Sequence, residues 1–139
     1  MLPGPALHDL IQILHQSGQL HIHLEAHGME APRLPHSTSH TVYRIVQELL
    51  SNVIRHAQAT EVQLQLTQHR DRLNIHFQDN GKGFDPRRLG KESGVGLYNI
   101  QSRTLELGGT FHLDSHPGKG TTAILNIPLT DPQQDWLHA

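Results

Sequence analysis

The sequence predicts an α+β fold, a two-layer α/β sandwich in which helices cover one face of a mixed, mostly antiparallel sheet. Segments with apolar residues at helical spacing and segments that alternate between apolar and polar residues follow in the order α-β-α-β-β-loop-α-β-β. Because helices and strands do not alternate strictly, a doubly wound parallel sheet is disfavoured. The length of 139 residues is that of one domain, which we place at residues 1–130, with a C-terminal tail at 131–139.

The first predicted elements are a helix, a strand and a second, longer helix. Residues 6–16 carry apolar side chains at helical spacing, and residues 19–26 alternate as in a strand. Two prolines and a glycine make residues 28–37 a loop. The long helix then runs to about Ala57. Three residues with hydroxyl side chains can cap its start: Ser37, Thr38 and Ser39.

The second half of the chain predicts two pairs of strands, separated by an irregular segment and a helix. Residues 61–68 and 72–78 alternate cleanly and form a hairpin. Residues 79–96 contain five glycines and a proline, too many for a regular element. Helical spacing returns at residues 95–107 and stops at Gly108-Gly109. The last two strands are predicted at residues 110–115 and 121–128.

Composition excludes several classes of function. Eleven basic and 13 acidic residues give a nearly balanced charge, which argues against a nucleic-acid-binding surface. The absence of cysteine excludes disulfides, thiolate zinc sites and cysteine nucleophiles. There is no long apolar run and no signal peptide, so we expect a soluble, cytoplasmic domain, while membrane attachment of a longer parent protein stays open. The 13 histidines, including His21 and His23 on one strand face, are expected to be solvated positions rather than metal ligands.

The first motif is Q-E-L-L-S-N-V-I-R-H-A, residues 47–57, within the long helix. Glu48, Asn52 and His56 are four residues apart and therefore lie on one helix face, with Arg55 beside them. Polar groups on one side of an otherwise apolar helix either meet solvent or line a site. Taken alone, this motif favours solvent.

The second motif is D-N-G-K-G-F, residues 79–84, immediately after a predicted strand. As a site, it would point the Asp79 carboxylate inward, and Gly81 and Gly83 would let the backbone pass close to a ligand. An ordinary turn has a similar composition, so this motif alone leaves both interpretations open.

The third motif is S-G-V-G-L-Y-N-I, residues 93–100, in which Gly94 and Gly96 open a predicted helix. Backbone N–H groups at a helix start attract anions, and glycine allows a phosphate to approach closely. Asn99 stands where the dinucleotide-binding motif G-x-G-x-x-G needs a third glycine, and the P-loop motif is absent. Without further context, a simple helix start explains this motif equally well.

In this order, the three motifs resemble those of the ATP-binding fold shared by sensor histidine kinases, gyrase and mismatch-repair ATPases, the GHKL superfamily. Residues 47–57 are similar to its N box, residues 79–84 to its first glycine box and residues 94–97 to its second. Residues 118–129 are similar to its closing segment. The resemblance covers about residues 7–130 and implies a Bergerat-type ATP-binding fold.

The resemblance implies a role for each motif residue. Asp79 would accept a hydrogen bond from the exocyclic amine of adenine, and Asn52 would supply a neutral oxygen to Mg²⁺. Arg55 matches a position that contacts phosphate, and His56 a position near the base. Glu48 matches the residue that activates water in hydrolytic relatives, although a supporting role beside Mg²⁺ is equally plausible.

The glycine-rich segments complete the implied ATP site. Gly94 and Gly96, followed by Leu97, would hold the phosphates. Thr121 or Thr122 would support the adenine pocket near Asp79. Residues 84–93 would form a lid with three basic residues within reach of phosphates: Arg87, Arg88 and Lys91.

The sequence of residues 43–57 is most similar to that of sensor kinases of the nitrate- and desaturase-sensing type. It implies a protein histidine kinase that binds Mg-ATP, phosphorylates a histidine on a dimerisation hairpin in a homodimeric parent, and signals to a response regulator. Leu7-His8-Asp9 looks like the family's phosphoacceptor motif, but the strand and loop between His8 and Glu48 leave no room for a hairpin. We therefore expect this chain to be the ATP-binding part of a longer kinase, monomeric and inactive alone.

Two other functions compete with this interpretation. One is a stand-alone anti-sigma-factor serine kinase, an ATP-dependent switch protein of the same superfamily, which has about this length. The sequence of residues 43–57 favours the sensor kinases instead. A degenerate module that binds no nucleotide is disfavoured because Glu48, Asn52, Asp79 and the motif glycines are all present.

Overall fold

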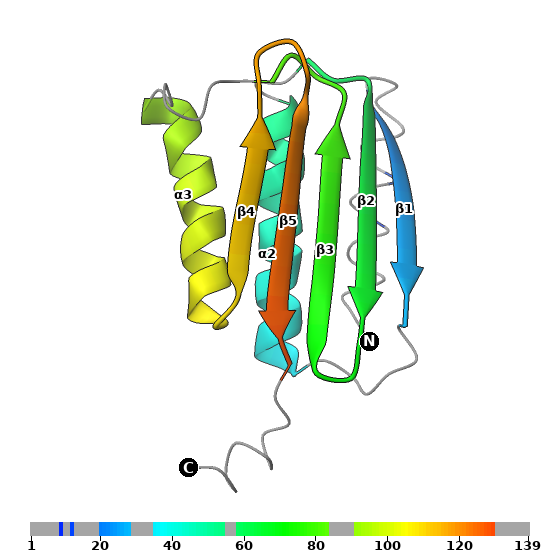
Figure 1. The fold of residues 1–139 in the computed structure, drawn as a ribbon, viewed down its shortest axis with the longest axis vertical. Coiled ribbons are helices and arrows are strands. Elements are labelled where there is room, and N and C mark those ends of the chain that lie inside the picture. The colour runs from blue at the N-terminus through cyan, green and yellow to red at the C-terminus, as the bar shows by residue number, and fades with distance from the viewer. Residues whose placement is uncertain are drawn as a thin grey trace, which may run out of the picture.

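The computed structural model describes residues 9, 12, 20–28, 35–54, 58–83 and 91–129, without the side chains of residues 36 and 91–96. Seven elements are labelled in Figure 1: β1 (His21–His27), α2 (His36–Asn52), β2 (Glu61–Gln68), β3 (Arg72–Asp79), α3 (Lys91–Glu106), β4 (Thr110–Ser115) and β5 (Thr121–Pro128). The predicted helix at residues 6–16 lies outside the described residues except for Asp9 and Gln12, which are helical and exposed. The proposed tail at residues 131–139 also lies outside them.

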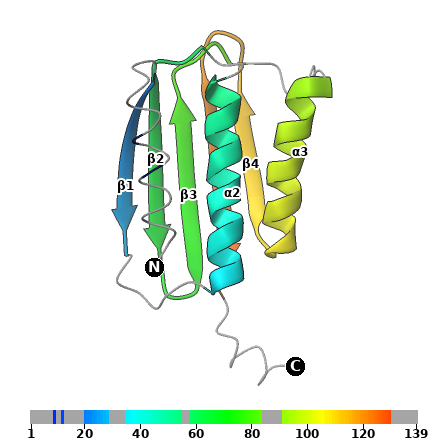
Figure 2. The same cartoon turned by 180° about the vertical axis from the view of Figure 1, so that it is seen from behind.

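The strands form one five-stranded sheet in the order β1-β2-β3-β5-β4. β1 pairs with β2 in parallel, and the other three pairs are antiparallel. Both α2 and α3 lie on the same face of this sheet, α2 over its middle and α3 towards the β4 edge (Figure 2). This arrangement confirms the predicted two-layer α+β fold with a mixed, mostly antiparallel sheet.

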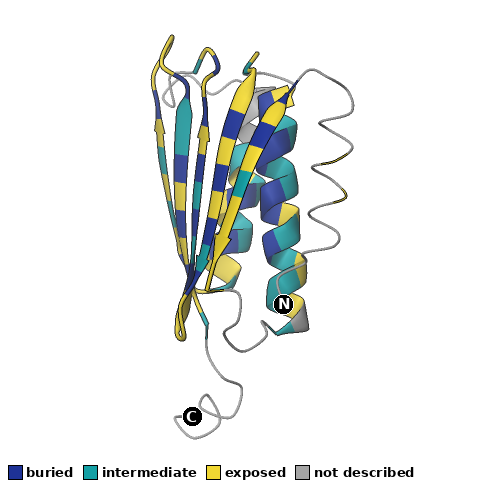
Figure 3. Ribbon diagram, turned by 90° about the vertical axis from the view of Figure 1, so that its right-hand side faces the viewer, coloured by how far each residue is buried: buried dark blue, intermediate teal, exposed yellow. Residues whose placement is uncertain are grey.

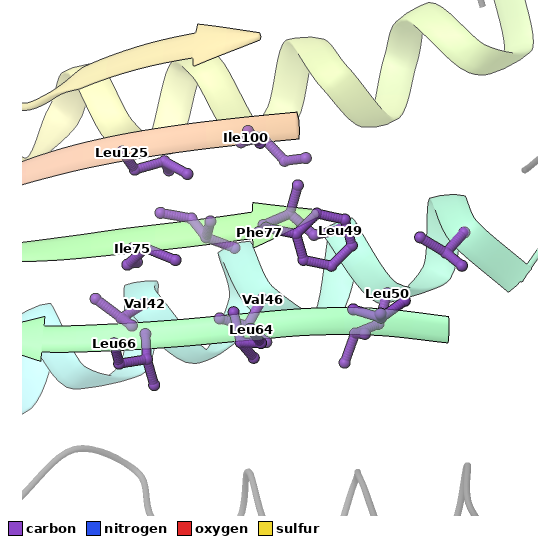
Figure 4. Packing of buried hydrophobic residues seen from close by; sticks show 14 of the residues in the cluster. Val42, Val46, Leu49, Leu50, Leu64, Leu66, Ile75, Phe77, Ile100 and Leu125 are labelled. Carbon is purple, nitrogen blue, oxygen red and sulfur yellow. The ribbon is translucent and has the colours of Figure 1, made fainter. Parts of the chain in front are cut away.

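The core lies between the sheet and α2. Alternate residues of each strand face the helices, so the strands show buried and exposed bands in turn (Figure 3). The helix contributes a stripe at helical spacing, whose side chains meet those of β2, β3 and β5 (Figure 4). Among the described residues, Phe77 is the largest fully buried side chain, and it precedes Asp79 on the same strand face. Truncating such a side chain to alanine typically costs about 3–5 kcal/mol.

The start of α2 differs from the prediction. The helix begins at His36 with Pro35 as its N-cap residue, and no side chain caps it. The predicted caps therefore lie inside the first turn, where the N–H of Ser39 donates to the Pro35 carbonyl at 2.9 Å. Proline favours this earlier start because its φ, here −53°, is already close to the helical value.

The far end of α2 is also shorter than expected. The α-helix ends at Asn52, and the backbone of Val53 and Ile54 continues as a π-turn. The Val53 N–H donates to the carbonyls of both Leu49 and Leu50, a bifurcated hydrogen bond of the kind common at helix ends. The remaining predicted helical residues, 55–57, lie outside the described residues.

The boundaries of α3 give one confirmed and one wrong prediction. The helix begins at Lys91 rather than Val95, because glycine within a helix costs only about 1 kcal/mol relative to alanine and does not forbid it. Its end is as predicted: Gly108 has φ +74°, its N–H donates to Leu105, and the Gly109 N–H donates to Thr104. These bonds form the Schellman motif that stops a helix. In the described part of the chain, no helix has the length and apolar composition needed to cross a membrane.

Candidate functional site

Segments that are far apart in the sequence meet at one end of the sheet. β3 and β4 end there, β5 begins there, α2 ends there and α3 begins there (Figure 1). The three motifs identified in the sequence lie on or directly after these element ends. The end of a sheet, where several elements terminate, carries many side chains that are not packed in the core. It is a common place for a ligand site.

Asp79 is the last residue of β3 and only 5% exposed. It follows Phe77 on the face that packs against the helices, so its carboxylate extends the row of core side chains. One carboxylate oxygen accepts a hydrogen bond from the Gly81 N–H at 2.8 Å. Burial raises the pKa of Asp79 above its ordinary value, and hydrogen bonds from the backbone of Gly81 and Thr121 partly offset this rise. The result is a desolvated acceptor at the sheet end.

Asn80 fixes the chain directly after Asp79. Its Oδ1 accepts hydrogen bonds from the backbone N–H groups of Thr60 and Glu61, both at 2.9 Å, and its Nδ2 donates to Thr60 Oγ1 at 2.9 Å. The start of β2 is thereby tied to the end of β3. The sequence pattern does not single out Asn80, although asparagine in a turn commonly bonds the backbone in this way.

The post-β3 loop (residues 80–83) packs against the β4–β5 turn (residues 116–120). Gly83 has φ +65°, and a Cβ there would overlap the His116 carbonyl oxygen. The Gly118 N–H donates to the Lys82 carbonyl across the same contact. Gly81 is buried. Close packing of two backbones therefore explains the glycine at position 83 by itself, whether or not a ligand approaches it.

The two candidate threonines lie on opposite faces of the sheet. Thr121 pairs with Asp79 in the antiparallel register and therefore shares its face. Thr122 pairs with Gln78 on the outer face. Of the two, only Thr121 lies beside Asp79.

The sequence does not single out Ser115, because its contacts depend on the register of the β4–β5 hairpin rather than on a motif. It is the last residue of β4, is 2% exposed, and pairs with Thr121. Its hydroxyl lies 2.8 Å from Thr121 Oγ1 and donates to the Gly120 carbonyl at 3.2 Å.

The N-box candidates that the structure describes lie along one flank of α2. Glu48 and Asn52 are half-buried and one helical turn apart, and Asn52 is the final residue of the α-helix. Glu48 Oε2 is shielded from solvent. Arg55 and His56 lie outside the described residues, so the structure says nothing of their predicted contacts.

The second glycine box lies within α3 rather than before it. The backbone of Gly94 and Gly96 is helical, and Leu97 is half-buried against the core. The lid candidates Arg87 and Arg88 lie outside the described residues, and the side chain of Lys91 is not described.

No group of three or more histidine and carboxylate side chains among the described residues is arranged to hold a metal ion. A magnesium ion carried by a nucleotide does not need such a group, because phosphates and water supply most of its ligands. A single amide oxygen such as that of Asn52, at the end of α2, fits this donor set.

Comparison with known proteins agrees with this architecture. The model of the family described as histidine kinase-, DNA gyrase B-, and HSP90-like ATPases matches residues 37–131. The sensor protein VraS of Staphylococcus saprophyticus is 34% identical over 126 residues, and that of Staphylococcus epidermidis is 35% identical. Each alignment covers 91% of this chain and 35% of the sensor protein, so the chain spans about a third of the length of these relatives.

A solved structure shows the same fold. The blue-light activated histidine kinase of Erythrobacter litoralis EL346 superposes with a TM-score of 0.74 at 21% identity, over 94% of this chain and 43% of that kinase. The matched family model, the homologous sensor proteins and the shared architecture lead to one conclusion. The chain belongs to the family of histidine kinase-, DNA gyrase B- and HSP90-like ATPases.

Proposed function

We propose that residues 1–130 are the ATP-binding catalytic domain of a two-component sensor histidine kinase of the nitrate- and desaturase-sensing type. The domain binds Mg-ATP and donates the γ-phosphate to a histidine on a dimerisation hairpin that is not part of this chain. The buried Asp79 carboxylate at the sheet end is the observation that carries this proposal. The homology to sensor proteins supports the kinase class.

Asp79 recognises the adenine base. An ionised carboxylate only accepts hydrogen bonds, so it pairs with the exocyclic amine of adenine and disfavours guanine, which has a carbonyl at that position. The Gly81 N–H holds one carboxylate oxygen in place before the base arrives. Thr121, on the same sheet face, lies next to this contact.

The ends of the helices bind the phosphates. Mg²⁺, when bound, neutralises charge on the β- and γ-phosphates. Asn52 supplies an amide oxygen to that ion, and Arg55 and His56 contact phosphate and base, as the family motif implies. The first turn of α3, which begins at Lys91 and includes Gly94, favours the phosphates through its dipole and its free N–H groups, and Gly96 follows in the next turn. Glu48 orients this region from the neighbouring turn of α2.

The parent protein would be a homodimer whose phosphorylated histidine passes its phosphoryl group to a response regulator. The chain spans 35% of the length of a sensor-protein relative, whose remaining length has room for a hairpin and a sensor. No nucleic-acid partner is proposed, because the charge of the chain is nearly balanced.

Titration calorimetry with a non-hydrolysable ATP analogue and Mg²⁺ tests the proposal directly. We expect saturable binding with a dissociation constant in the micromolar to millimolar range, equivalent to about 4–8 kcal/mol. GTP should bind more weakly, because its base presents a carbonyl to Asp79. Absence of binding at millimolar nucleotide would rule out the ATP-binding role.

A further inference from the structure

A polar row crosses three strands at the site end of the sheet. Asp79 of β3 pairs with Thr121 of β5, which pairs in turn with Ser115 of β4. The next row inward is apolar and consists of Phe77, Ala123 and Leu113. All three polar residues share the helix-facing side, and two of them, Asp79 and Ser115, are buried. The contact between Ser115 and Thr121 determines whether the Thr121 hydroxyl acts as a hydrogen-bond donor or an acceptor towards Asp79 and a ligand.

The second hydrogen bond of the Ser115 hydroxyl favours Thr121 as the donor in their contact. Ser115 donates its hydroxyl proton to the Gly120 carbonyl, and its oxygen lies 2.8 Å from Thr121 Oγ1. Either hydroxyl could donate in the short contact, but because a serine hydroxyl has one proton, both hydrogen bonds form at once only when Thr121 is the donor. In that arrangement, Thr121 keeps only lone pairs for a neighbour on its other side. Together, Thr121 and Asp79 present acceptors.

The β4–β5 turn links this arrangement to the Asp79 backbone. Gly120 has φ +75°, and a Cβ there would overlap the Asp79 carbonyl oxygen. The Ser115 bond to the Gly120 carbonyl therefore also fixes the segment that rests on Asp79. Ser115 is bonded to Thr121 and to the turn, so we expect its effect on a bound base to act through Thr121.

We propose that Ser115 is a positioning residue for base selection. Its oxygen accepts a hydrogen bond from the Thr121 hydroxyl, so that Thr121 and Asp79 both remain acceptors for an exocyclic amine. The inference rests on the proposed ATP-binding function. A base with a carbonyl in place of the amine, such as hypoxanthine, meets two acceptors and is rejected. Without the Ser115 hydroxyl, the Thr121 hydroxyl has no acceptor at that position and can instead donate a hydrogen bond to that carbonyl.

The test measures the ratio of the ADP and IDP dissociation constants by titration calorimetry with Mg²⁺, using the 139-residue chain. Ser115→Ala should lower the preference for ADP about three- to tenfold, the range of one neutral hydrogen bond. Ser115→Thr, which keeps a hydroxyl, should retain the preference. In a Thr121→Val background, Ser115→Ala should change the ratio no further, because the group through which it acts is missing.

Thr104→Val is the matched control for loss of a buried hydroxyl. Thr104 is fully buried, and its hydroxyl donates to the Ile100 carbonyl at 2.7 Å, near the opposite end of α3. This variant should leave the ADP/IDP ratio unchanged even if it lowers the melting temperature. An unchanged ratio in Ser115→Ala, or an equal effect of Ser115→Ala with and without the Thr121 hydroxyl, would overturn the inference. If Ser115→Ala does not fold, Thr121→Val and Thr121→Ser decide: the first must lose the preference and the second must keep it.

Failure of the inference differs from failure of the proposed function. A parent chain that binds neither ADP nor IDP would remove the ATP-binding proposal itself. A parent chain that prefers ADP, with variants that keep this preference, would leave the proposal intact and remove only the assignment to Ser115.

Discussion

At the scale of single residues, Asp79 combines a cost in stability with a proposed role in base recognition. Its pKa is raised mainly by burial, so the native state holds the carboxyl proton more tightly than the unfolded chain does. Between the ordinary pKa of 3.8 and the raised value, the free energy of unfolding therefore falls as pH rises. Above that interval, the native protein carries a buried charge that a ligand amine is suited to meet.

The first prediction follows from this sign. Asp79→Asn removes the buried charge while its amide oxygen can still accept the Gly81 N–H. The variant should be at least as stable as the parent at pH 7, and this advantage should shrink as pH falls towards 3.8. Urea unfolding at several pH values measures the difference. Asp71→Asn, at an exposed position, is the control for loss of a surface carboxylate. A pH-independent difference between Asp79→Asn and the parent would contradict the prediction.

Recognition should respond in the opposite direction. Asp79→Asn should weaken adenine-nucleotide binding by about 1.5–3 kcal/mol, because a charge-assisted hydrogen bond is lost and the amide NH₂ competes for the same position. Calorimetric titration with ATP and with adenosine should show the loss for both ligands. Affinity equal to the parent's would make Asp79 a turn residue only.

Asn52 should separate the phosphates from the base. Asn52→Ala removes the amide oxygen proposed to contact Mg²⁺, so Mg-ATP binding should weaken by about 1–3 kcal/mol while adenosine binding persists. Titrations with and without Mg²⁺ distinguish the two contributions. Equal losses for Mg-ATP and adenosine would show that Asn52 supports the fold rather than the ion.

At the scale of elements, the contact between the post-β3 loop and the β4–β5 turn holds the site end together. Gly83 and Gly118 both have positive φ, but their surroundings differ. A Cβ at Gly83 overlaps backbone oxygens, whereas a Cβ at Gly118 meets nothing within 4 Å. Gly118→Ala should cost only the left-handed backbone strain, about 1–2 kcal/mol. Gly83→Ala should cost more, since the two loops must also separate. Chemical denaturation of both variants measures the difference, and equal losses would contradict the proposed loop contact.

The elements also show what the sequence can predict. Alternation in β2, β3 and β5 predicts their buried faces because one face meets the helices along its whole length. The Gly108-Gly109 stop is local chemistry and is equally readable. The early start of α3 cannot be predicted in this way, because the presence of two glycines does not show whether tertiary packing offsets their low helix propensity. Asn80 and Ser115 escape notice for a related reason: their partners, Thr60 and Thr121, are set by strand register rather than by spacing.

At the scale of the whole molecule, the candidate site lies at one end of the sheet, where five elements meet. The proposed phosphoryl transfer also needs an acceptor histidine. Phosphoryl transfer requires the γ-phosphate and the acceptor nitrogen in line and in close contact. We propose that the described residues form a nucleotide-binding layer on a sheet and that a hairpin elsewhere in the parent supplies the acceptor histidine. His8, the one histidine in a phosphoacceptor-like sequence, lies outside the described residues.

The last prediction concerns this missing component. The isolated chain should bind ATP yet incorporate essentially no acid-labile phosphate from γ-labelled ATP, because nothing presents an acceptor to the γ-phosphate. Adding the parent kinase's hairpin in trans should restore labelling on the hairpin, with ADP as the other product, and His8→Ala should not change it. Efficient labelling of the chain at His8 would refute the assignment of the acceptor to a separate hairpin. Labelling of an added protein on serine would instead favour a switch kinase of the anti-sigma type, because serine phosphate survives acid whereas histidine phosphate does not.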